Sequence, residues 1–91
     1  MIASFRCTET EKIFKGKQSL KFGHIQRVAF RKLVLLNAAE RLSDLAGVGT
    51  ALEALKADRA GRYAIRVNDQ YRICFSWSEG SASAVEIVDY H

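Results

Sequence analysis

The chain has 91 residues, of which 48% are apolar, 26% are charged and none is proline. This length predicts a single globular domain over residues 1–91 and leaves no room for a second one. The apolar fraction excludes a disordered tail, and no apolar run approaches the roughly 18 residues that a membrane span requires. The first residues lack a signal-peptide pattern, so we expect a soluble protein of the cytoplasm.

Positive charge is concentrated in the first half of the chain. The formal net charge is +4, from 14 Lys and Arg against 10 Asp and Glu. Residues 1–52 hold nine basic and four acidic side chains, a balance of +5, whereas residues 53–91 hold five and six, a balance of −1. This excess could form a contact surface for a polyanion, or it could simply keep a helix surface solvated.

The two cysteines give no sign of a metal site. Cys7 and Cys74 stand 67 positions apart, without a CxxC pair or clustered histidines. Because a zinc site needs about four converging ligands, we expect no metal and no cofactor. Both thiols are expected to be buried as small apolar groups rather than joined in a disulfide.

The first half of the chain is expected to begin with a short edge strand over residues 1–7, whose partner in the sheet the sequence does not identify. Residues 8–11, Thr-Glu-Thr-Glu, have the form of a capping box and predict a short helix that ends near Phe14. A longer helix fits residues 24–42 by its apolar period. Its core-facing stripe is predicted to consist of Ile25, Val28, Ala29, Leu33, Leu36 and Ala39.

Basic side chains on this longer helix divide between its two faces. Lys32 falls inside the apolar arc and is expected to extend its ammonium group to water. Arg27, Arg31 and Arg41 lie on the opposite side, so part of the basic excess is displayed on one helix face.

The second half of the chain is expected to be mostly strand. A glycine-punctuated connection over 44–49 and an apolar stretch over 52–55 lead into strands at 61–67, 71–77 and 82–88. Apolar and polar residues alternate in these strands, and tight turns join them. Two helices followed by an antiparallel meander predict an α+β fold, with both helices on one face of a mostly antiparallel sheet of about four strands.

Three arginines form the first pattern with chemical potential. Arg62, Arg66 and Arg72 fall on the non-core face of two predicted strands that a tight turn joins. Guanidinium groups offer planar, bidentate donors to phosphate oxygens. The alternative is a sheet face that uses arginine for solubility or for a cross-strand ion pair with Glu86.

The second pattern is the sequence Asp89-Tyr90-His91, which brings a carboxylate, a phenol and an imidazole to the end of the last strand. Histidine has an ordinary pKa of about 6.5 and can serve as acid or base near neutral pH. Strict alternation, however, places Tyr90 on the opposite face from the other two, and terminal residues often fray.

Together the two patterns suggest cleavage of an RNA phosphodiester without a metal ion. A base would take the proton of a ribose 2′-OH, which attacks the adjacent phosphorus, while a second group protonates the departing 5′ oxygen. Arg72 is the natural phosphate clamp and His91 the acid or the base. Tyr90 could stack on a nucleobase or donate a hydrogen bond.

An ordered set of motifs along the whole chain resembles one known family. The motifs are Met1-Ile2-x-Ser4-Phe5, Leu55-Lys56-x-Asp58-Arg59-x-Gly61, Tyr63-x-Ile65-Arg66-Val67-Asn68, Tyr71-Arg72-Ile73-Cys74-Phe75 and Val88-Asp89-Tyr90-His91. With them the chain resembles the HigB group of the RelE/ParE toxin superfamily, the plasmid maintenance killer proteins of bacterial toxin–antitoxin modules.

This resemblance implies a RelE-like fold and a ribosome-dependent mRNA endonuclease that cuts codons in the A site of the 30S subunit. The family's catalytic positions fall on Lys56, Arg72, Asp89, Tyr90 and His91. RNA-binding roles are expected for Glu53, Arg59, Arg62 and Arg66. The resemblance also implies a HigA-type helix-turn-helix antitoxin that neutralises the toxin in a hetero-oligomer, and a basic helical surface that rests on ribosomal RNA.

One position departs from the family pattern. Some relatives have a histidine three residues before the lysine, where this chain has Glu53. Either Glu53 takes an acid–base or orienting role, or His91 works without a second imidazole.

Two further functions stay open. A ParE-like toxin would bind and inhibit DNA gyrase without catalysis, although that branch lacks the Tyr-His ending. A catalytically inert RNA-binding protein would need only the arginine face.

Overall fold

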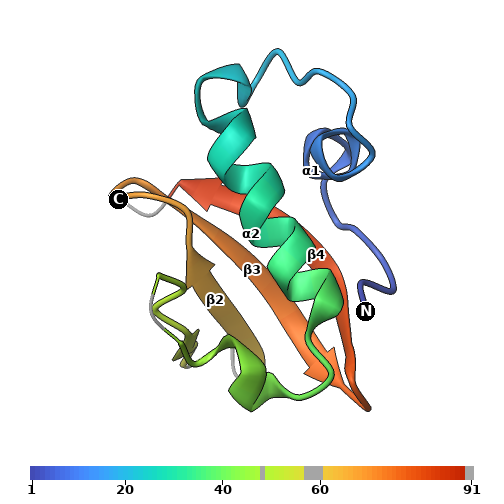
Figure 1. Ribbon diagram of the computed structural model, residues 1–91, viewed down its shortest axis with the longest axis vertical. Helices are drawn as coiled ribbons and strands as arrows, with labels where there is room; N and C mark the ends of the chain where they lie inside the picture. The colour runs from blue at the N-terminus through green and yellow to red at the C-terminus, as the bar shows by residue number, and fades with distance from the viewer. Residues whose placement is uncertain (48, 57–60, 90–91) are drawn as a thin grey trace.

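The second half of the chain forms one antiparallel sheet, and the first half supplies the helices (Figure 1). The computed structural model describes residues 1–47, 49–56 and 61–89. The elements in chain order are α1 Thr8–Phe14, η1 Gly23–Ile25, α2 Gln26–Ala38, η2 Leu42–Leu45, β1 Glu53–Ala54, β2 Arg62–Arg66, β3 Tyr71–Ser78 and β4 Ser81–Asp89. The four strands pair in the order β1-β2-β3-β4. An α+β fold with two α-helices and a four-stranded antiparallel sheet is therefore confirmed.

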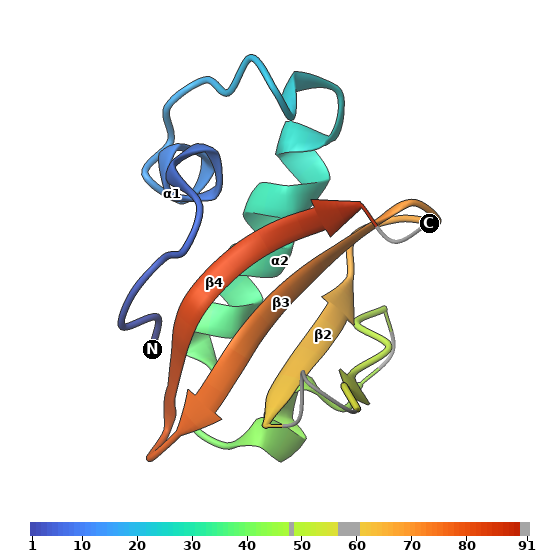
Figure 2. The ribbon, with the colours of Figure 1, turned by 180° about the vertical axis from the view of Figure 1, so that it is seen from behind.

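The hydrophobic core lies between the helices and the sheet. Figures 1 and 2 show α2 crossing one side of the sheet, with α1 beside the edge formed by β4. Residues with fully buried side chains come from both layers: Ile13, Ala29, Leu33, Leu36, Ile65, Ile73, Phe75, Ala82 and Val85. Of the predicted stripe, Ala29, Leu33 and Leu36 are buried and Val28 is half-buried within α2, which confirms the period of this helix; Ile25 and Ala39, just outside its ends, are buried as well.

The start of α1 differs from the predicted capping box. The N-cap is Cys7 in extended conformation, and no side chain caps the helix, so Thr8 already lies inside the first turn. Thr10 is buried instead, and its Oγ1 accepts a hydrogen bond from the Ile87 N–H at 3.0 Å. The threonine thus ties α1 to β4, because a buried hydroxyl is satisfied by a strand amide rather than by its own helix.

The end of α2 also differs from the prediction, because the helix stops at Ala38 and not near residue 42. Ala39 is extended, at φ −67° and ψ 131°. The N–H groups of Glu40 and Arg41 donate to Asp44 Oδ2, each at 3.0 Å, and this lowers the pKa of Asp44. A side-chain cap for the following 3₁₀ turn therefore competes with continuation of the helix.

The N-terminal segment lies along the free edge of β4, but it is not a continuous strand. Ile2 and Phe5 form isolated parallel bridges with Ala82 and Val85. Between the bridges the N–H of Ala84 donates to the Ser4 hydroxyl at 2.9 Å instead of to a backbone carbonyl. The predicted edge strand is therefore correct in position and wrong in regularity.

The two cysteines, Lys32 and the lengths of the helices were also subjects of prediction. Both cysteines are free, with Cys74 buried as predicted and Cys7 only half-buried. Lys32 reaches out of the apolar arc, and its Nζ donates to the Gly49 carbonyl. None of the helices in the described ranges is long and apolar enough to cross a membrane.

Candidate functional site

The turn between β2 and β3 organises the candidate site. Asn68 Oδ1 accepts hydrogen bonds from the N–H groups of Gln70 at 2.9 Å and Tyr71 at 2.8 Å. Asparagine favours such turns because its short amide reaches backbone donors two residues further on. The turn thereby fixes where β3 begins.

Arg72, the second residue of β3, is anchored to this turn. Its Nη1 donates to the Asn68 carbonyl at 2.7 Å and to the Tyr71 carbonyl at 3.2 Å. Its Nε lies 4.0 Å from Oε1 of Glu53 on β1, and the Arg72 side chain is only 21% exposed. The guanidinium is therefore held in one orientation, with a carboxylate beside it.

Asp89, the last residue of β4, reaches the same end of the sheet. It pairs in register with Tyr71, and its Oδ2 accepts a hydrogen bond from Gln70 Nε2 at 2.9 Å. The β2–β3 turn thus contacts two of the predicted catalytic residues, Arg72 through backbone carbonyls and Asp89 through a side-chain amide.

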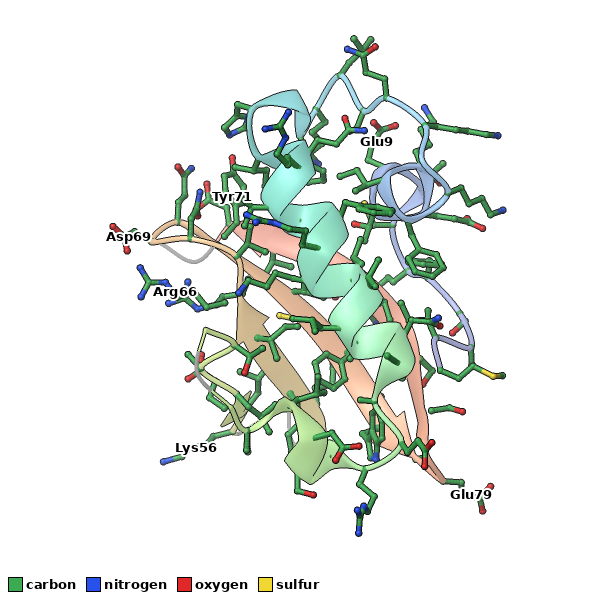
Figure 3. The ribbon with its side chains drawn as sticks, in the orientation of Figure 1. Glu9, Lys56, Arg66, Asp69, Tyr71 and Glu79 are labelled. Atoms are coloured by element: carbon green, nitrogen blue, oxygen red, sulfur yellow. The ribbon has the colours of Figure 1, made fainter. Side chains whose placement is uncertain are left out.

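A second guanidinium lies across from Arg72. Arg66, at the end of β2, is its register partner and forms an ion pair with Asp69, as Figure 3 shows. Like charges directly opposite each other on a sheet repel, and here each arginine has its own carboxylate. Two guanidinium groups carried by register partners of adjacent strands can bind a phosphate once the anion displaces those carboxylates.

Arg62 lies further along β2, and its guanidinium is hydrogen-bonded to other groups. Its guanidinium donates to Glu86 Oε2 at 2.9 Å, the Ala84 carbonyl at 3.1 Å and the Ser76 hydroxyl at 3.2 Å. Glu86 also pairs with Arg6 at 3.2 Å. This geometry matches the cross-strand ion pair with Glu86 that the sequence left as the alternative for Arg62.

The remaining predicted site residues are not brought to Arg72 by the described part of the chain. Lys56 is exposed, and Figure 3 shows it projecting outward, apart from Arg66 and Asp69. Arg59, Tyr90 and His91 lie outside the described residues.

Two residues of the site were missed by sequence reasoning, Asn68 and Gln70. The signal for Asn68 was present, because an Asn-Asp-Gln turn predicts side-chain bonds to the backbone. No pattern pointed to Gln70, whose contact with Asp89 depends on the pairing of β3 with β4. Among the described residues, no group of three or more His, Cys, Asp and Glu side chains could hold a metal ion.

Comparison with known proteins gives matches in sequence and in fold. A family model described as the RelE-like toxin of type II toxin–antitoxin system HigB matches residues 3–91. Toxin HigB-1 of Vibrio cholerae serotype O1 is 44% identical over 59 residues. That match spans 64% of this chain and 62% of the Vibrio protein, so less than two thirds of the relative's length is covered.

The similar solved structures are more distant in sequence and show the fold alone. The YoeB–YefM complex from Staphylococcus aureus matches with a TM-score of 0.63 and 21% identity, over 100% of this chain and 98% of that chain. The YoeB/ParE toxin from Agrobacterium tumefaciens matches with a TM-score of 0.62 and 18% identity, over 99% and 100%.

Proposed function

The chain belongs to the RelE-like HigB toxins of type II toxin–antitoxin systems, and on that premise we propose that it is a ribosome-dependent mRNA endonuclease. Its substrate is mRNA in the A site of the 30S subunit, and it acts in the cytoplasm. The observation that carries the proposal is that the β2–β3 turn anchors both Arg72 and Asp89 at the same end of the sheet, where Tyr90 and His91 follow Asp89 in sequence.

The proposed reaction needs no metal ion. A base removes the proton from a ribose 2′-OH, and the 2′ oxygen forms a bond to the adjacent phosphorus while the bond to the 5′ oxygen breaks. The products are a 2′,3′-cyclic phosphate and a 5′-hydroxyl, which receives its proton from a second group. Positive charge close to the non-bridging oxygens stabilises the negative charge that builds there.

We assign the roles as follows. Arg72 holds the phosphate, and Lys56 adds positive charge when RNA brings the strand to it. His91 exchanges the proton, and Tyr90 stacks on a nucleobase or donates a hydrogen bond. Asp89, fixed by Gln70, orients the residues that follow it.

RNA contact is assigned to a second group of residues. Arg66 has an exposed guanidinium and Arg59 adds a further cation. Glu53, which faces Arg72, orients that guanidinium until substrate arrives. Arg62 supports binding indirectly, since its ion pair with Glu86 joins β2 to β4.

The proposal includes a partner. We propose that a HigA-type helix-turn-helix antitoxin neutralises the toxin in a hetero-oligomer. The support is the family itself and the fold shared with the toxin in a YoeB–YefM complex.

The test is mapping of transcript 5′ ends within minutes of induction, in parallel for the wild type, His91→Ala and Arg72→Ala. The matched control is His24→Ala, because His24 is the other histidine of the chain and is exposed on η1. We expect new ends in register with codons for the wild type and the control, and none for the other two variants.

Two results would count against the proposal. Full toxicity of both His91→Ala and Arg72→Ala would exclude the assigned roles. Intact transcripts beside arrested growth would favour a binding toxin, with DNA gyrase the next target to test.

A further inference from the structure

Helix α2 has a second apolar side, which faces away from the core. Phe30, Val34 and Ala38 follow one another at four-residue spacing and therefore form a line along the helix. Phe30 is 40% exposed and Val34 43%. The core of this protein is built from a different stripe of α2, so packing within the chain does not account for these side chains.

A hollow beside Phe30 extends this apolar line toward α1. It has a volume of about 600 Å³ and is bordered by Ile13, Gly16, Gly23 and Phe30. A Cβ atom at either glycine would meet no other atom within 4 Å, so the hollow is open on that side. It has room for the side chains of a partner segment.

The charged side chains that border the hollow have one sign. Residues 12–39 contain seven Lys and Arg and no Asp or Glu. Arg27 and Arg31 are exposed and border the hollow directly. A ligand that covers this face must therefore carry negative charge.

Three kinds of anionic or self-complementary partner can be compared. A second copy of the chain would bring its own arginines against Arg27 and Arg31, which disfavours symmetric packing. RNA would satisfy the cations but would place phosphates over Phe30 and Val34. An acidic amphipathic helix fits both the apolar line and the cations. It buries apolar side chains on one stripe and pairs its carboxylates with the two arginines.

We propose that this surface of α2, formed by Arg27, Phe30, Arg31 and Val34, is the docking site of an acidic amphipathic segment of the antitoxin. The identity of the partner rests on the proposed function. Apolar residues of the segment enter the hollow beside Phe30, and its carboxylates bind the two guanidinium groups. The Arg72 end of the sheet is not part of this site.

The test combines antitoxin binding with toxicity. The probe is the full-length antitoxin encoded beside this chain, titrated by calorimetry against wild-type toxin, Phe30→Asp and a double Arg27→Glu, Arg31→Glu variant. The matched control is Leu20→Asp, because Leu20 is apolar and 95% exposed but does not border the hollow. Growth after induction, with and without antitoxin, is recorded for each.

We expect Kd to rise by about 100-fold for Phe30→Asp, as for truncation of a central interface residue. The double arginine variant should also bind more weakly, whereas Leu20→Asp should stay within about twofold of the wild type. Phe30→Asp and Leu20→Asp should still arrest growth without antitoxin, which shows that they fold. Folding of the double arginine variant is checked by its thermal melt instead, because Arg27 and Arg31 lie on the basic helix face that is expected to rest on ribosomal RNA.

Other outcomes would overturn the proposal. Unchanged affinity of Phe30→Asp and of the double variant would exclude the surface as the docking site. Loss of toxicity with unchanged antitoxin affinity would show that this surface of α2 contacts the ribosome instead.

If Phe30→Asp loses both antitoxin affinity and toxicity, the Gly23→Leu variant distinguishes misfolding from loss of the docking site. Leucine at position 23 fills the hollow from the surface and leaves the core intact. Wild-type affinity of Gly23→Leu would then overturn the proposal. Failure of the endonuclease proposal would appear separately, as intact RNA beside unaltered binding data.

Discussion

Arg62 and Arg72 lie on adjacent strands and differ in what surrounds their guanidinium groups. Arg62 is 14% exposed and bound to Glu86, which is itself 21% exposed. Removing the Arg62 side chain leaves the poorly solvated carboxylate of Glu86 without its closest partner. We therefore predict that Arg62→Ala lowers the free energy of unfolding by about 2 kcal/mol.

Urea denaturation followed by fluorescence of Trp77 measures this loss. The control is Arg66→Ala, because the ion pair of Arg66 with Asp69 is exposed and contributes little, on the order of 0.5 kcal/mol. Equal stability of the two variants would contradict the structural role of Arg62.

This difference between the arginines could not be predicted from sequence. Alternation places Arg62, Arg66 and Arg72 on one face, but it does not say which acceptors lie opposite. Those depend on an irregularity in the pairing of β3 with β4, where Cys74 pairs with Glu86 and Ser76 with Ser83. Ala84, at φ 51°, lies in the shifted part of β4, and its carbonyl accepts from Arg62. Alanine is uncommon at such φ values, so the sequence carried no signal for the shift.

At the level of elements, the buried hydroxyl of Ser19 helps to hold the segment between α1 and α2. Ser19 donates to Glu9 Oε1 at 2.8 Å, and its oxygen accepts from the Phe22 N–H at 3.1 Å. Lys12 also donates to Glu9, and these two hydrogen bonds lower the pKa of the Glu9 carboxyl. Figure 3 shows Glu9 facing this connecting segment.

Replacement of Glu9 by alanine should therefore reduce thermal stability in a pH-dependent way. A carboxyl whose pKa is lowered by folding stabilises the protein above its unfolded pKa of about 4.3, and this contribution is lost as the pH falls through the lower folded value. The Tm difference between wild type and Glu9→Ala should be full at pH 7 and vanish toward pH 2.

Glu11→Ala is the matched control for this measurement. Glu11 lies on the same helix and forms only an exposed pair with Lys15 at 3.0 Å. Its Tm should change little across the same range. A difference for Glu9→Ala that persists unchanged at pH 2 would show that the carboxylate is not the stabilising group.

The helices and strands themselves are predicted from hydrophobic period and turn residues. The positions of their ends are harder to predict from sequence. The apolar stripe of α2 and the alternation of β2 and β3 express local geometry, so sequence alone reveals them. The early end of α2 depends on Asp44 capping the next turn, and the place of residues 2–5 depends on the free edge of β4. The first is a local contact whose competition with the helix the apolar period does not reveal, and the second is a contact between distant segments.

For the whole molecule, the proposed docking surface and the candidate site lie on different elements. Arg27 and Arg31 lie on α2, whereas Arg66 projects from β2 away from that helix (Figure 3). An antitoxin segment on α2 need not contact Arg66 or Arg72, although η1 beside the hollow packs on Tyr71, the neighbour of Arg72. Neutralisation would then act by blocking entry to the ribosome rather than by filling the catalytic site.

Arginine modification with phenylglyoxal can test this arrangement. In free toxin the exposed arginines Arg27, Arg31 and Arg66 should all react. In the toxin–antitoxin complex we expect modification of Arg27 and Arg31 to slow by at least about tenfold, because a buried guanidinium excludes the reagent. Arg66 should react at the rate seen in free toxin, measured by mass spectrometry of the digested peptides. Protection of Arg66 with continued reaction at Arg27 and Arg31 would instead place the antitoxin over the candidate site and leave α2 free to contact the ribosome.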